Sequence, residues 1–402
     1  KPQYLQAREI YRKIMNATPP GRVLHRVFHR IKDAIKTSLL PCSMFEDMGF
    51  QYMGPVDGHD VKTLTRLLDY ASKVNGPVLL HVKTIKGKGY PPAEKNPDAF
   101  HGIGPFHKET GALITSKTAE TFSSRFGHDL TELAKQDQRI CAITAAMTSG
   151  TGLAAFSKAF SDRFFDVGIA EEHAVTMAAG MAKQGLIPVF AVYSTFFQRS
   201  YDMLMHDIAI DHIHAVFGID RAGLVGDDGE THHGLFDLGF LQTIPGITVL
   251  CPASLDELSD MLERAVHRMD GPVAVRYPRG GENFYSENHS DAPDYLLKDG
   301  TDLTIVTFGT LTGNCLAVAD RLQQEGISAQ VLKLNQLVPL PTELALDCLS
   351  KTKRLLVAEE CVTQGSPGQG ILAAAAQSGL TLEGVAVCSC GKDFVPHGTI
   401  PQ

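Results

Sequence analysis

Residues 165–182 read FDVGIAEEHAVTMAAGMA, a short apolar run that ends at Ala170 and a helix that opens with Glu171 and Glu172. The helix is rich in alanine and glycine, and these small residues allow a neighbouring element to pack closely against it. Carboxylates in the first turn complement the helix macrodipole, so the acidic pair taken alone has an ordinary structural explanation. The same alternation of an apolar run and a helix recurs along the chain, and this indicates the class of fold.

Short apolar runs bounded by turn residues predict β-strands at 77–84, 139–146, 187–193, 213–219, 247–251, 272–277, 303–309, 328–334, 354–359 and 385–389. Helical stretches lie between them, at 119–135, 171–184, 197–210, 254–269, 312–325 and 368–378. Continuous hydrophobicity, in place of alternation, is typical of parallel strands that helices cover on both faces. The sequence therefore predicts an α/β fold built on parallel sheets.

Two polar segments rich in turn residues, 85–112 and 280–301, divide these elements. The 402 residues are too many for one ordinary domain, since domains average about 150 residues. We expect three α/β domains, at 1–116, 117–290 and 291–402. The first offers one clear strand and is expected to be incomplete.

Composition and charge argue against several classes of partner. No run approaches the ~18 apolar residues of a membrane span, so we expect no membrane association. The formal net charge of -8 argues against a nucleic-acid partner, which usually requires a basic patch. The eight cysteines show neither a C-x-x-C pair nor metal-ligand spacing, as expected for buried thiols in a reducing compartment.

Polar loops follow the predicted elements of the middle domain at four places. They lie in 165–182, in YSTFFQRSYDMLMHDIA (193–209), in GIDRAGLVGDDGETHHGLFDLGFL (218–241) and in AVRYPRG (274–280). In an open parallel sheet, ligands bind at the carboxyl ends of the strands. Four loops rich in Arg, His, Asp and Gly therefore predict a ligand site in this domain.

These segments resemble the pyrimidine-binding domain of thiamine-diphosphate enzymes, and in detail they resemble the 1-deoxy-D-xylulose-5-phosphate synthase family. MGPVDGHD (53–60), KGKGYPPAEK (86–95) and FHGIGPF (100–106) precede them in that family's order. The resemblance covers nearly the whole chain and implies a transketolase-like fold, with 291–402 similar to the transketolase C-terminal domain. It further implies a homodimer in the cytoplasm, or in the plastid of a plant or alga.

The resemblance also implies roles for single residues around the cofactor. Glu171 matches the glutamate that hydrogen-bonds the pyrimidine ring of thiamine diphosphate, where a carboxyl group favours the imino tautomer. Phe196 matches the aromatic residue that stacks on that ring, and Tyr90 matches a tyrosine that contacts the cofactor. His101 matches a histidine on the substrate side.

A second group of residues resembles the family's substrate contacts. The anchor for the phosphate of glyceraldehyde 3-phosphate corresponds to Tyr193, Arg221 and Arg276. Arginine suits that role because its guanidinium presents a planar fork of donors. The polar contacts near the reacting carbons correspond to Arg199, Asp228 and His232, and His232 is the candidate for proton transfer.

Several of these residues have a chemically equivalent neighbour, which leaves alternatives open: Glu172 beside Glu171, Asp227 beside Asp228, and His233 beside His232. The choice of Asp228 and His232 keeps the family spacing G-x-D-G-x-T-H. His59 could equally cap a turn or pair with Asp57, and we leave it out of the catalytic set.

The family binds Mg²⁺ and the cofactor's diphosphate through a Gly-Asp-Gly string that an Asn follows. The nearest string here, at 225–229, belongs to the substrate loop, so no metal ligand is named. We expect the 402 residues to be a portion of a longer protein whose N-terminal segment holds that site. A further helix is expected after Gln402.

The resemblance implies a transferase that uses thiamine diphosphate to decarboxylate pyruvate and condense the product with D-glyceraldehyde 3-phosphate. The products would be 1-deoxy-D-xylulose 5-phosphate and CO₂, at the first step of the non-mevalonate isoprenoid pathway. Two alternatives stay open: a transketolase or 2-oxo-acid dehydrogenase β-subunit, and a catalytically inactive fragment. Segments 53–60 and 86–106 argue against a β-subunit, and the retained Glu171 and His232 argue against inactivity.

Overall fold

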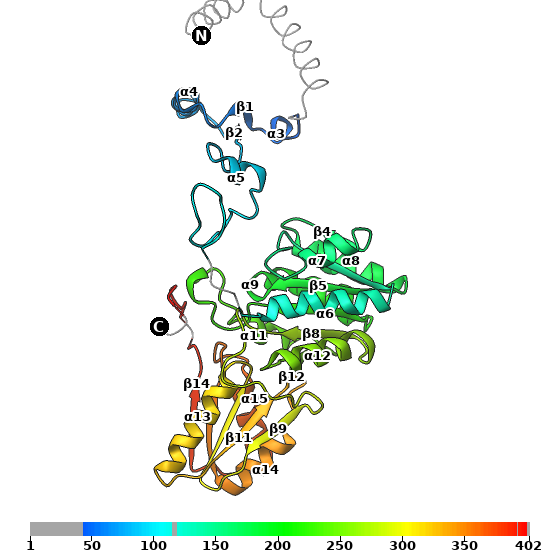
Figure 1. Ribbon diagram of the computed structural model, residues 1–402, viewed down its shortest axis with the longest axis vertical. Helices are drawn as coiled ribbons and strands as arrows, with labels where there is room; N and C mark the ends of the chain where they lie inside the picture. Colours follow the sequence, from blue (N-terminus) through cyan, green and yellow to red (C-terminus); the bar gives the residue numbers. More distant parts are fainter. Residues whose placement is uncertain (1–42, 115–118, 392, 400–402) are drawn as a thin grey trace, which may run out of the picture. The chain divides into compact units, whose positions relative to one another are not determined.

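The computed structural model describes residues 43–114, 119–391 and 393–399. The chain divides into two compact units, Lys1–Thr118 and Ala119–Gln402, and each has its own sheet structure (Figure 1). In the described residues, no helix is both long and apolar enough to cross a membrane.

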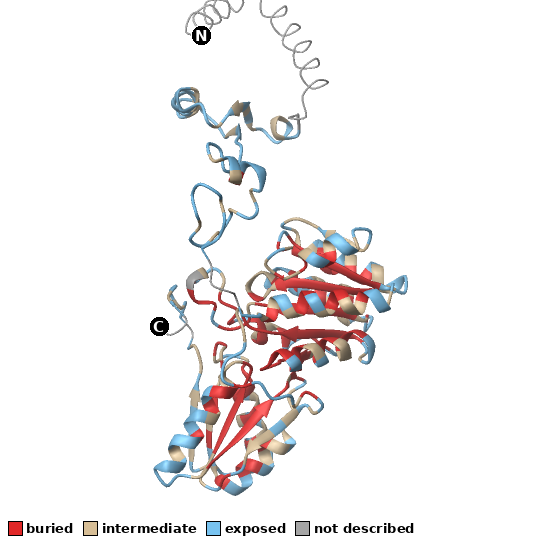
Figure 2. Cartoon of the chain, in the orientation of Figure 1, coloured by how far each residue is buried: buried red, intermediate tan, exposed pale blue. Residues whose placement is uncertain are grey.

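The described part of the first unit is small and largely exposed. Strands β1 (Gln51–Asp57) and β2 (Val78–Lys83) pair in parallel, and helix α4 (Val61–Ala71) joins them. The short helices are α3 (Ser43–Asp47) and α5 (Pro91–Lys95). Among the described residues of this unit, only Ala93 is buried (Figure 2). This agrees with the expectation that these elements bury little by themselves.

The second unit contains a seven-stranded sheet in the order β12-β7-β8-β6-β5-β3-β4. Its strands are β3 (Ile140–Thr144), β4 (Phe164–Asp166), β5 (Ile187–Tyr193), β6 (Ala215–Asp220), β7 (Thr248–Leu250), β8 (Pro272–Arg276) and β12 (Gln336–Val338). Neighbouring strands are parallel except β12, which pairs antiparallel with β7 at the edge. Strands β3, β6 and β8 are buried along their whole length, as expected for a sheet covered on both faces.

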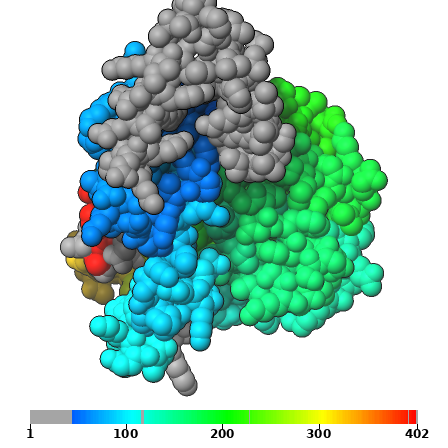
Figure 3. All heavy atoms as spheres, turned by 90° about the horizontal axis from the view of Figure 1, so that it is seen from above, coloured from blue at the N-terminus to red at the C-terminus, as the bar shows by residue number. Residues whose placement is uncertain are grey.

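Helices cover this sheet with two separate apolar clusters. Helices α6 (Phe122–Gln136) and α12 (Leu255–His267) contribute to one, and α8 (Glu171–Lys183) contributes to the other. Thr121 begins α6 with a capping box, in which its hydroxyl accepts the Ser124 N–H at 3.1 Å. The remaining short helices are α7 (Ala154–Ala159), α9 (Ser194–Phe197), η1 (Gln198–Ser200), α10 (Tyr201–Met203), η2 (Leu204–Ala209), η3 (Gly226–Asp228) and α11 (Asp237–Leu241). The surface that the green part of this unit presents in Figure 3 is rounded and continuous.

The stretch 197–210 is helical, as expected, but its winding changes along its length. That segment winds as the 3₁₀ turn η1, the short helix α10 and the π-helical turn η2. The spacing of Phe197, Leu204 and Ile208, all fully buried, predicts a helix but does not encode changes in its winding.

A five-stranded sheet follows, in the order β14-β13-β10-β11-β9. Its strands are β9 (Asp294–Lys298), β10 (Leu303–Phe308), β11 (Ala329–Leu334), β13 (Arg354–Ala358) and β14 (Gly384–Cys388). Its helices are α13 (Leu311–Gln324), α14 (Glu343–Thr352) and α15 (Pro367–Gln377). Side chains of β10, β11 and β13 join the apolar cluster that contains α8, so the two sheets share a core.

The predicted α/β fold with predominantly parallel sheets is confirmed. The three-domain division at 116 and 290 stays a prediction. Strand β12, from the expected third domain, completes the edge of the seven-stranded sheet, so these two parts of the chain are joined by main-chain pairing.

Candidate active site

Glu171 is the first residue of α8 and is only 2% exposed. Its Oε2 accepts a hydrogen bond from Nη1 of Arg199 at 3.0 Å. A buried carboxylate at a helix N-terminus is stabilised by the macrodipole and by this guanidinium. Glu172, its neighbour, is partly exposed, so burial favours Glu171 as the residue that faces a bound ligand.

Next to this pair lies an aromatic cluster of three residues, Tyr193, Phe196 and His232. Strand β5 ends at Tyr193, and α9 carries Phe196 one turn later; the two rings stack with centroids 5.9 Å apart. The His232 ring meets Phe196 edge-on, at 5.3 Å. The Arg199 guanidinium lies 5.6 Å from the Phe196 ring. Phe196 therefore contacts both the residue that pairs with Glu171 and the predicted proton-transfer histidine.

The substrate loop, residues 221–236, leaves β6 and returns to α11. Gly223 and Gly234 close it by exchanging backbone hydrogen bonds of 2.9 and 2.8 Å. Arg221 has a φ of +58°, a left-handed conformation that costs about 1–3 kcal/mol outside glycine. Its guanidinium lies 3.8 Å over the Tyr193 ring and donates to the Gly150 carbonyl at 2.9 Å. Such strain commonly marks a functional position.

Asp228 brings Arg221 near a further arginine, Arg279, which the sequence analysis missed. Oδ2 of Asp228 lies 3.0 Å from Nη1 of Arg279 and 3.8 Å from Nε of Arg221. Arg279 also donates to the Val225 carbonyl at 2.9 Å and remains 37% exposed. Asp220 also approaches Arg221, at 3.3 Å, so the two guanidinium groups face two carboxylates. What favours an anion here is the fork of donors that each guanidinium presents.

Arg276, which the resemblance assigns to the phosphate anchor, is buried and paired in the described structure. Arg276 lies inside β8 with a side chain only 4% exposed, and its Nε and Nη2 donate to both oxygens of Asp237, at 2.8 and 3.2 Å. Its donor fork is thus already directed at a buried carboxylate. The role of Arg276 in the phosphate site stays a prediction, and Arg279 is a further candidate for the same site.

The contacts also separate the two adjacent histidines. His233 is buried, and its Nδ1 accepts the Val225 N–H at 3.1 Å. His232 is partly exposed, lies 2.8 Å from the Thr231 hydroxyl through Nδ1, and faces the aromatic cluster. This favours His232 for chemistry and His233 for the shape of the loop. The side chain of Asp227 is outside the described part of the chain.

Burial alters the acidity of two groups beneath the substrate loop. It raises the pKa of Asp220, at the end of β6, to about 6, although Arg221 acts in the opposite direction. Nη1 of Arg221 lies 3.3 Å from Oδ1 of Asp220, whose Oδ2 has no hydrogen-bond partner among the described residues. Burial likewise raises the pKa of Tyr193. The buried side of the loop therefore disfavours negative charge.

Tyr90 and His101 lie in the first unit, so their predicted roles beside the cofactor and substrate stay predictions. The Tyr90 hydroxyl donates to the Lys108 carbonyl at 2.8 Å, and its ring meets Phe100 at 5.5 Å. His101 is exposed. His59 accepts the Ile85 N–H at 2.8 Å, a contact that ties the loops after β1 and β2 together.

In the residues that the structure describes, no group of three or more His, Cys, Asp or Glu side chains is arranged to hold a metal ion.

Three family models match successive segments of the chain. Residues 1–84 match the family described as 1-deoxy-D-xylulose-5-phosphate synthase. Residues 120–281 match the transketolase pyrimidine-binding domain, and residues 295–402 match the transketolase C-terminal domain. Over these three matched segments, the chain is similar to 1-deoxy-D-xylulose-5-phosphate synthases and to transketolases.

Two curated 1-deoxy-D-xylulose-5-phosphate synthases illustrate the relationship. That of Desulfitobacterium hafniense (strain Y51) is 43% identical over 406 residues, which cover 99% of this chain and 64% of the relative. That of Heliobacterium modesticaldum is 43% identical over 410 residues, which cover 99% of this chain and 62% of the relative. The chain thus spans less than two thirds of the length of these 1-deoxy-D-xylulose-5-phosphate synthases.

Solved structures show the same fold. A chain described as "Split gene transketolase, inactive beta4 tetramer" superposes with a TM-score of 0.62 and 27% identity, covering 69% of this chain and 90% of that chain. A Pichia stipitis transketolase superposes with a TM-score of 0.57 and 17% identity, covering 71% of this chain and 43% of that one. The second likeness concerns the fold alone.

Proposed function

We propose that the full-length protein is a 1-deoxy-D-xylulose-5-phosphate synthase. As a thiamine-diphosphate-dependent transferase, it would decarboxylate pyruvate and join the two-carbon unit to D-glyceraldehyde 3-phosphate, giving 1-deoxy-D-xylulose 5-phosphate and CO₂. One observation carries the proposal: the aromatic cluster is in contact both with Arg199, the partner of the buried Glu171, and with Arg221, which shares the Asp228 carboxylate with Arg279.

The described residues fit the pyrimidine end of thiamine diphosphate. A buried carboxylate, Glu171, suits a protonated ring nitrogen, and the partly buried ring of Phe196 offers a face on which a heteroaromatic ring can stack. When bound, the cofactor supplies an acidic thiazolium carbon and an electron sink. Arg199 would hold the Glu171 carboxylate in place. Mg²⁺ belongs to the proposal through the family resemblance.

On the acceptor side, the residues of the chain would bind and orient a phosphorylated aldehyde. Arg221 and Arg276 would bind its phosphate, and Arg279 is a further candidate, with Asp228 fixing the guanidinium groups of Arg221 and Arg279. Tyr193 supports Arg221 through its ring. His232 lies against Phe196 with a partly exposed imidazole, where it would donate a proton to, or stabilise, an oxygen of the reacting aldehyde.

A transketolase is the second candidate, because the similarity to the split-gene transketolase extends over 90% of that chain. The chemistry separates the two: a transketolase transfers a two-carbon unit from a ketose phosphate without releasing CO₂. A homodimer in the cytoplasm is proposed from the family resemblance.

The test is CO₂ release from pyruvate by the full-length protein with thiamine diphosphate and Mg²⁺, measured with and without D-glyceraldehyde 3-phosphate. We expect release that the aldehyde stimulates, together with 1-deoxy-D-xylulose 5-phosphate. Transfer from xylulose 5-phosphate with no release from pyruvate would instead indicate a transketolase. Absence of both activities, in protein of full length and normal folding, would support the catalytically inactive alternative.

A further inference from the structure

The guanidinium of Arg221 is held by residues that lie outside the substrate loop. We propose that Asp220, the last residue of β6, is a positioning residue for Arg221. Its buried carboxylate and the Gly150 carbonyl hold the Arg221 guanidinium in the orientation that binds the acceptor's phosphate. The inference rests on the proposed function for the identity of the ligand. It gives Asp220 a role in the site that the sequence motifs do not suggest.

Two oxygen atoms accept hydrogen bonds from the same terminal nitrogen of Arg221. Nη1 donates to the Gly150 carbonyl at 2.9 Å and to Oδ1 of Asp220 at 3.3 Å. The Asp220 side chain is completely buried, and that of Arg221 is 14% exposed. Water screens charges little in such surroundings, so the carboxylate attracts the guanidinium strongly and in a fixed direction. Nη1 is thus directed into the protein.

The ring of Tyr193 fixes the face of the same guanidinium. The central carbon of the Arg221 guanidinium lies 3.8 Å from the ring centroid. The Tyr193 hydroxyl packs against Gly150, where a Cβ would overlap with its oxygen. Any larger residue in place of Gly150 would therefore displace the ring, the carbonyl or both. Gly150 thus supports Arg221 through its carbonyl and through Tyr193.

These contacts leave one terminal nitrogen of Arg221 for a ligand. Nε lies 3.8 Å from Oδ2 of Asp228, and Nη1 carries both hydrogen bonds. Among the described residues, Nη2 has no hydrogen-bond partner. A guanidinium is planar, so its direction is set once Nη1 and one face are fixed. Nη2 is therefore the donor available to a phosphate, and Asp220 helps to set its direction.

Strand pairing keeps the Asp220 carboxylate in place. Strand β6 lies within the seven-stranded sheet, and Asp220 is opposite Tyr193 of β5 in the strand register. The next residue, Arg221, has a φ of +58°, so the chain turns sharply as it leaves the strand. Such strained conformations persist only where the surrounding contacts determine them. Asp220 and Tyr193 supply contacts of this kind from two paired strands.

The test substitutes Asp220→Asn in the full-length protein and measures the affinity for sn-glycerol 3-phosphate, an unreactive phosphate that resembles the acceptor. The pH is set well above the pKa of Asp220, which burial raises to about 6, so that the amide removes a charge and keeps the size of the side chain. We expect the dissociation constant to rise about tenfold to hundredfold, because small misplacements of a binding group have effects of this size. The KM for unphosphorylated D-glyceraldehyde should change less than about twofold, because Arg221 then has no phosphate to bind.

A double variant shows whether the effect of Asp220 passes through Arg221. Arg221→Ala removes the guanidinium, so adding Asp220→Asn to it should weaken glycerol 3-phosphate binding by less than about twofold more. A general structural role of Asp220 predicts instead that the two losses add. Asp220→Ser, which replaces the carboxylate by a smaller neutral group, provides the same measurements if Asp220→Asn does not fold.

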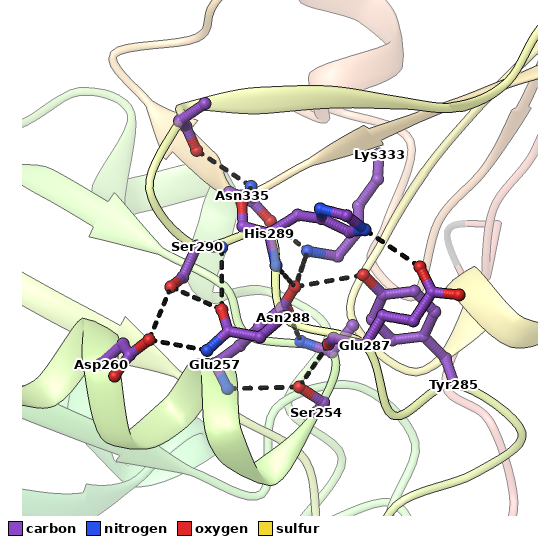
Figure 4. Close-up of polar contacts among 12 residues, drawn as sticks. Ser254, Glu257, Asp260, Tyr285, Glu287, Asn288, His289, Ser290, Lys333 and Asn335 are labelled. Carbon is purple, nitrogen blue, oxygen red and sulfur yellow. Dashed lines mark hydrogen bonds and ion pairs between the residues drawn. The ribbon is translucent and has the colours of Figure 1, made fainter.

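A matched control is available in a buried ion pair of the same unit, Glu257 and Lys333 (Figure 4). Lys333 Nζ lies 2.7 and 2.8 Å from the two Glu257 oxygens, and both side chains are fully buried. The Glu257→Gln variant removes a buried carboxylate charge in the same way as Asp220→Asn. No hydrogen bond or ion pair of these two residues in the described structure reaches the substrate loop, so Glu257→Gln should lower the melting temperature without weakening glycerol 3-phosphate binding.

The outcomes separate the positioning role from the proposed function. Wild-type affinity in folded Asp220→Asn, additive losses in the double variant, or equal losses in Asp220→Asn and Glu257→Gln would overturn the positioning role alone. Absence of glycerol 3-phosphate binding by the wild-type protein would overturn the acceptor assignment itself, and the positioning role with it.

Discussion

Arg279 and Asp228 form an ion pair in which Nη1 lies 3.0 Å from Oδ2, and Nε of Arg221 approaches the same oxygen at 3.8 Å. One carboxylate thus holds two guanidinium groups that would otherwise repel each other. The pair remains partly exposed, whereas Arg276 is buried. Arg279 is therefore the more exposed of the two arginines in this segment.

The first prediction concerns Arg279→Ala. Losing a charge-assisted bond to phosphate should raise the KM for D-glyceraldehyde 3-phosphate about ten- to hundredfold, with a much smaller effect on the KM for pyruvate. Steady-state kinetics with each substrate varied in turn measure both constants. Arg268→Ala, which removes an exposed arginine paired with Glu263, is the control. An unchanged aldehyde KM in Arg279→Ala would remove Arg279 from the phosphate site.

The second prediction compares Glu171→Gln with Glu172→Gln. Glu171 is the buried member of the pair, so its amide variant should lower kcat about 10²- to 10⁴-fold, as loss of an acid–base group does. Glu172→Gln should remain within a fewfold of wild type. The measurement is single-turnover CO₂ release at saturating cofactor. Equal losses in the two variants would mean that burial does not identify the functional carboxylate.

Buried parallel strands could be predicted from the sequence, whereas the short strand β4 and the antiparallel edge strands β9 and β12 could not. The run 187–193 predicts β5 with its observed bounds, because a strand covered on both faces must be apolar throughout. Strand β4 has three residues, and β12 joins the sheet edge in antiparallel pairing. Strand β9 lies within the polar segment that the sequence analysis interpreted as a break. These strands depend on pairing partners that no local pattern reveals.

The candidate site likewise could be predicted only in part, because the sequence motifs identify residue types but not their burial or their hydrogen-bond partners. The order of motifs was sufficient to choose Glu171 and His232, and their burial and contacts agree with that choice. The segment AVRYPRG offers two arginines, Arg276 and Arg279, and the order of motifs does not decide how they share the phosphate. Arg276 is the last residue of β8 and Arg279 follows it by three residues, so their roles depend on where the strand ends. The ion pair between Arg276 and Asp237 is visible only in the structure.

The third prediction concerns the stability contributed by Asp220. Burial raises its pKa to about 6 from an ordinary value near 4, so the folded protein binds this proton more tightly than the unfolded chain does. That contribution is complete below about pH 4 and is lost as the pH rises through about 6. Two pKa units correspond to about 3 kcal/mol. Asp220→Asn should therefore gain about 3 kcal/mol relative to wild type between pH 4 and pH 7.5.

Denaturant unfolding of both proteins across that pH range measures the difference in the free energy of unfolding. Asp162→Asn, which removes an exposed carboxylate, is the control. A difference between wild type and Asp220→Asn that stays constant with pH would show that Asp220 titrates alike in the folded and unfolded states.

The fourth prediction concerns the Glu257–Lys333 pair, which links α12 to β11 (Figure 4). Besides Lys333, Glu257 accepts the His289 and Ala253 N–H groups at 3.1 and 2.8 Å, so its charge is fully satisfied by its surroundings. Lys333→Met should destabilise the protein by about 3–5 kcal/mol, because it leaves this carboxylate buried without its cation. Replacing both residues, as Glu257→Gln with Lys333→Met, should recover part of the loss. Thermal and denaturant unfolding measure both effects, and a double variant no more stable than Lys333→Met would mean that packing, not the unpaired charge, accounts for the destabilisation.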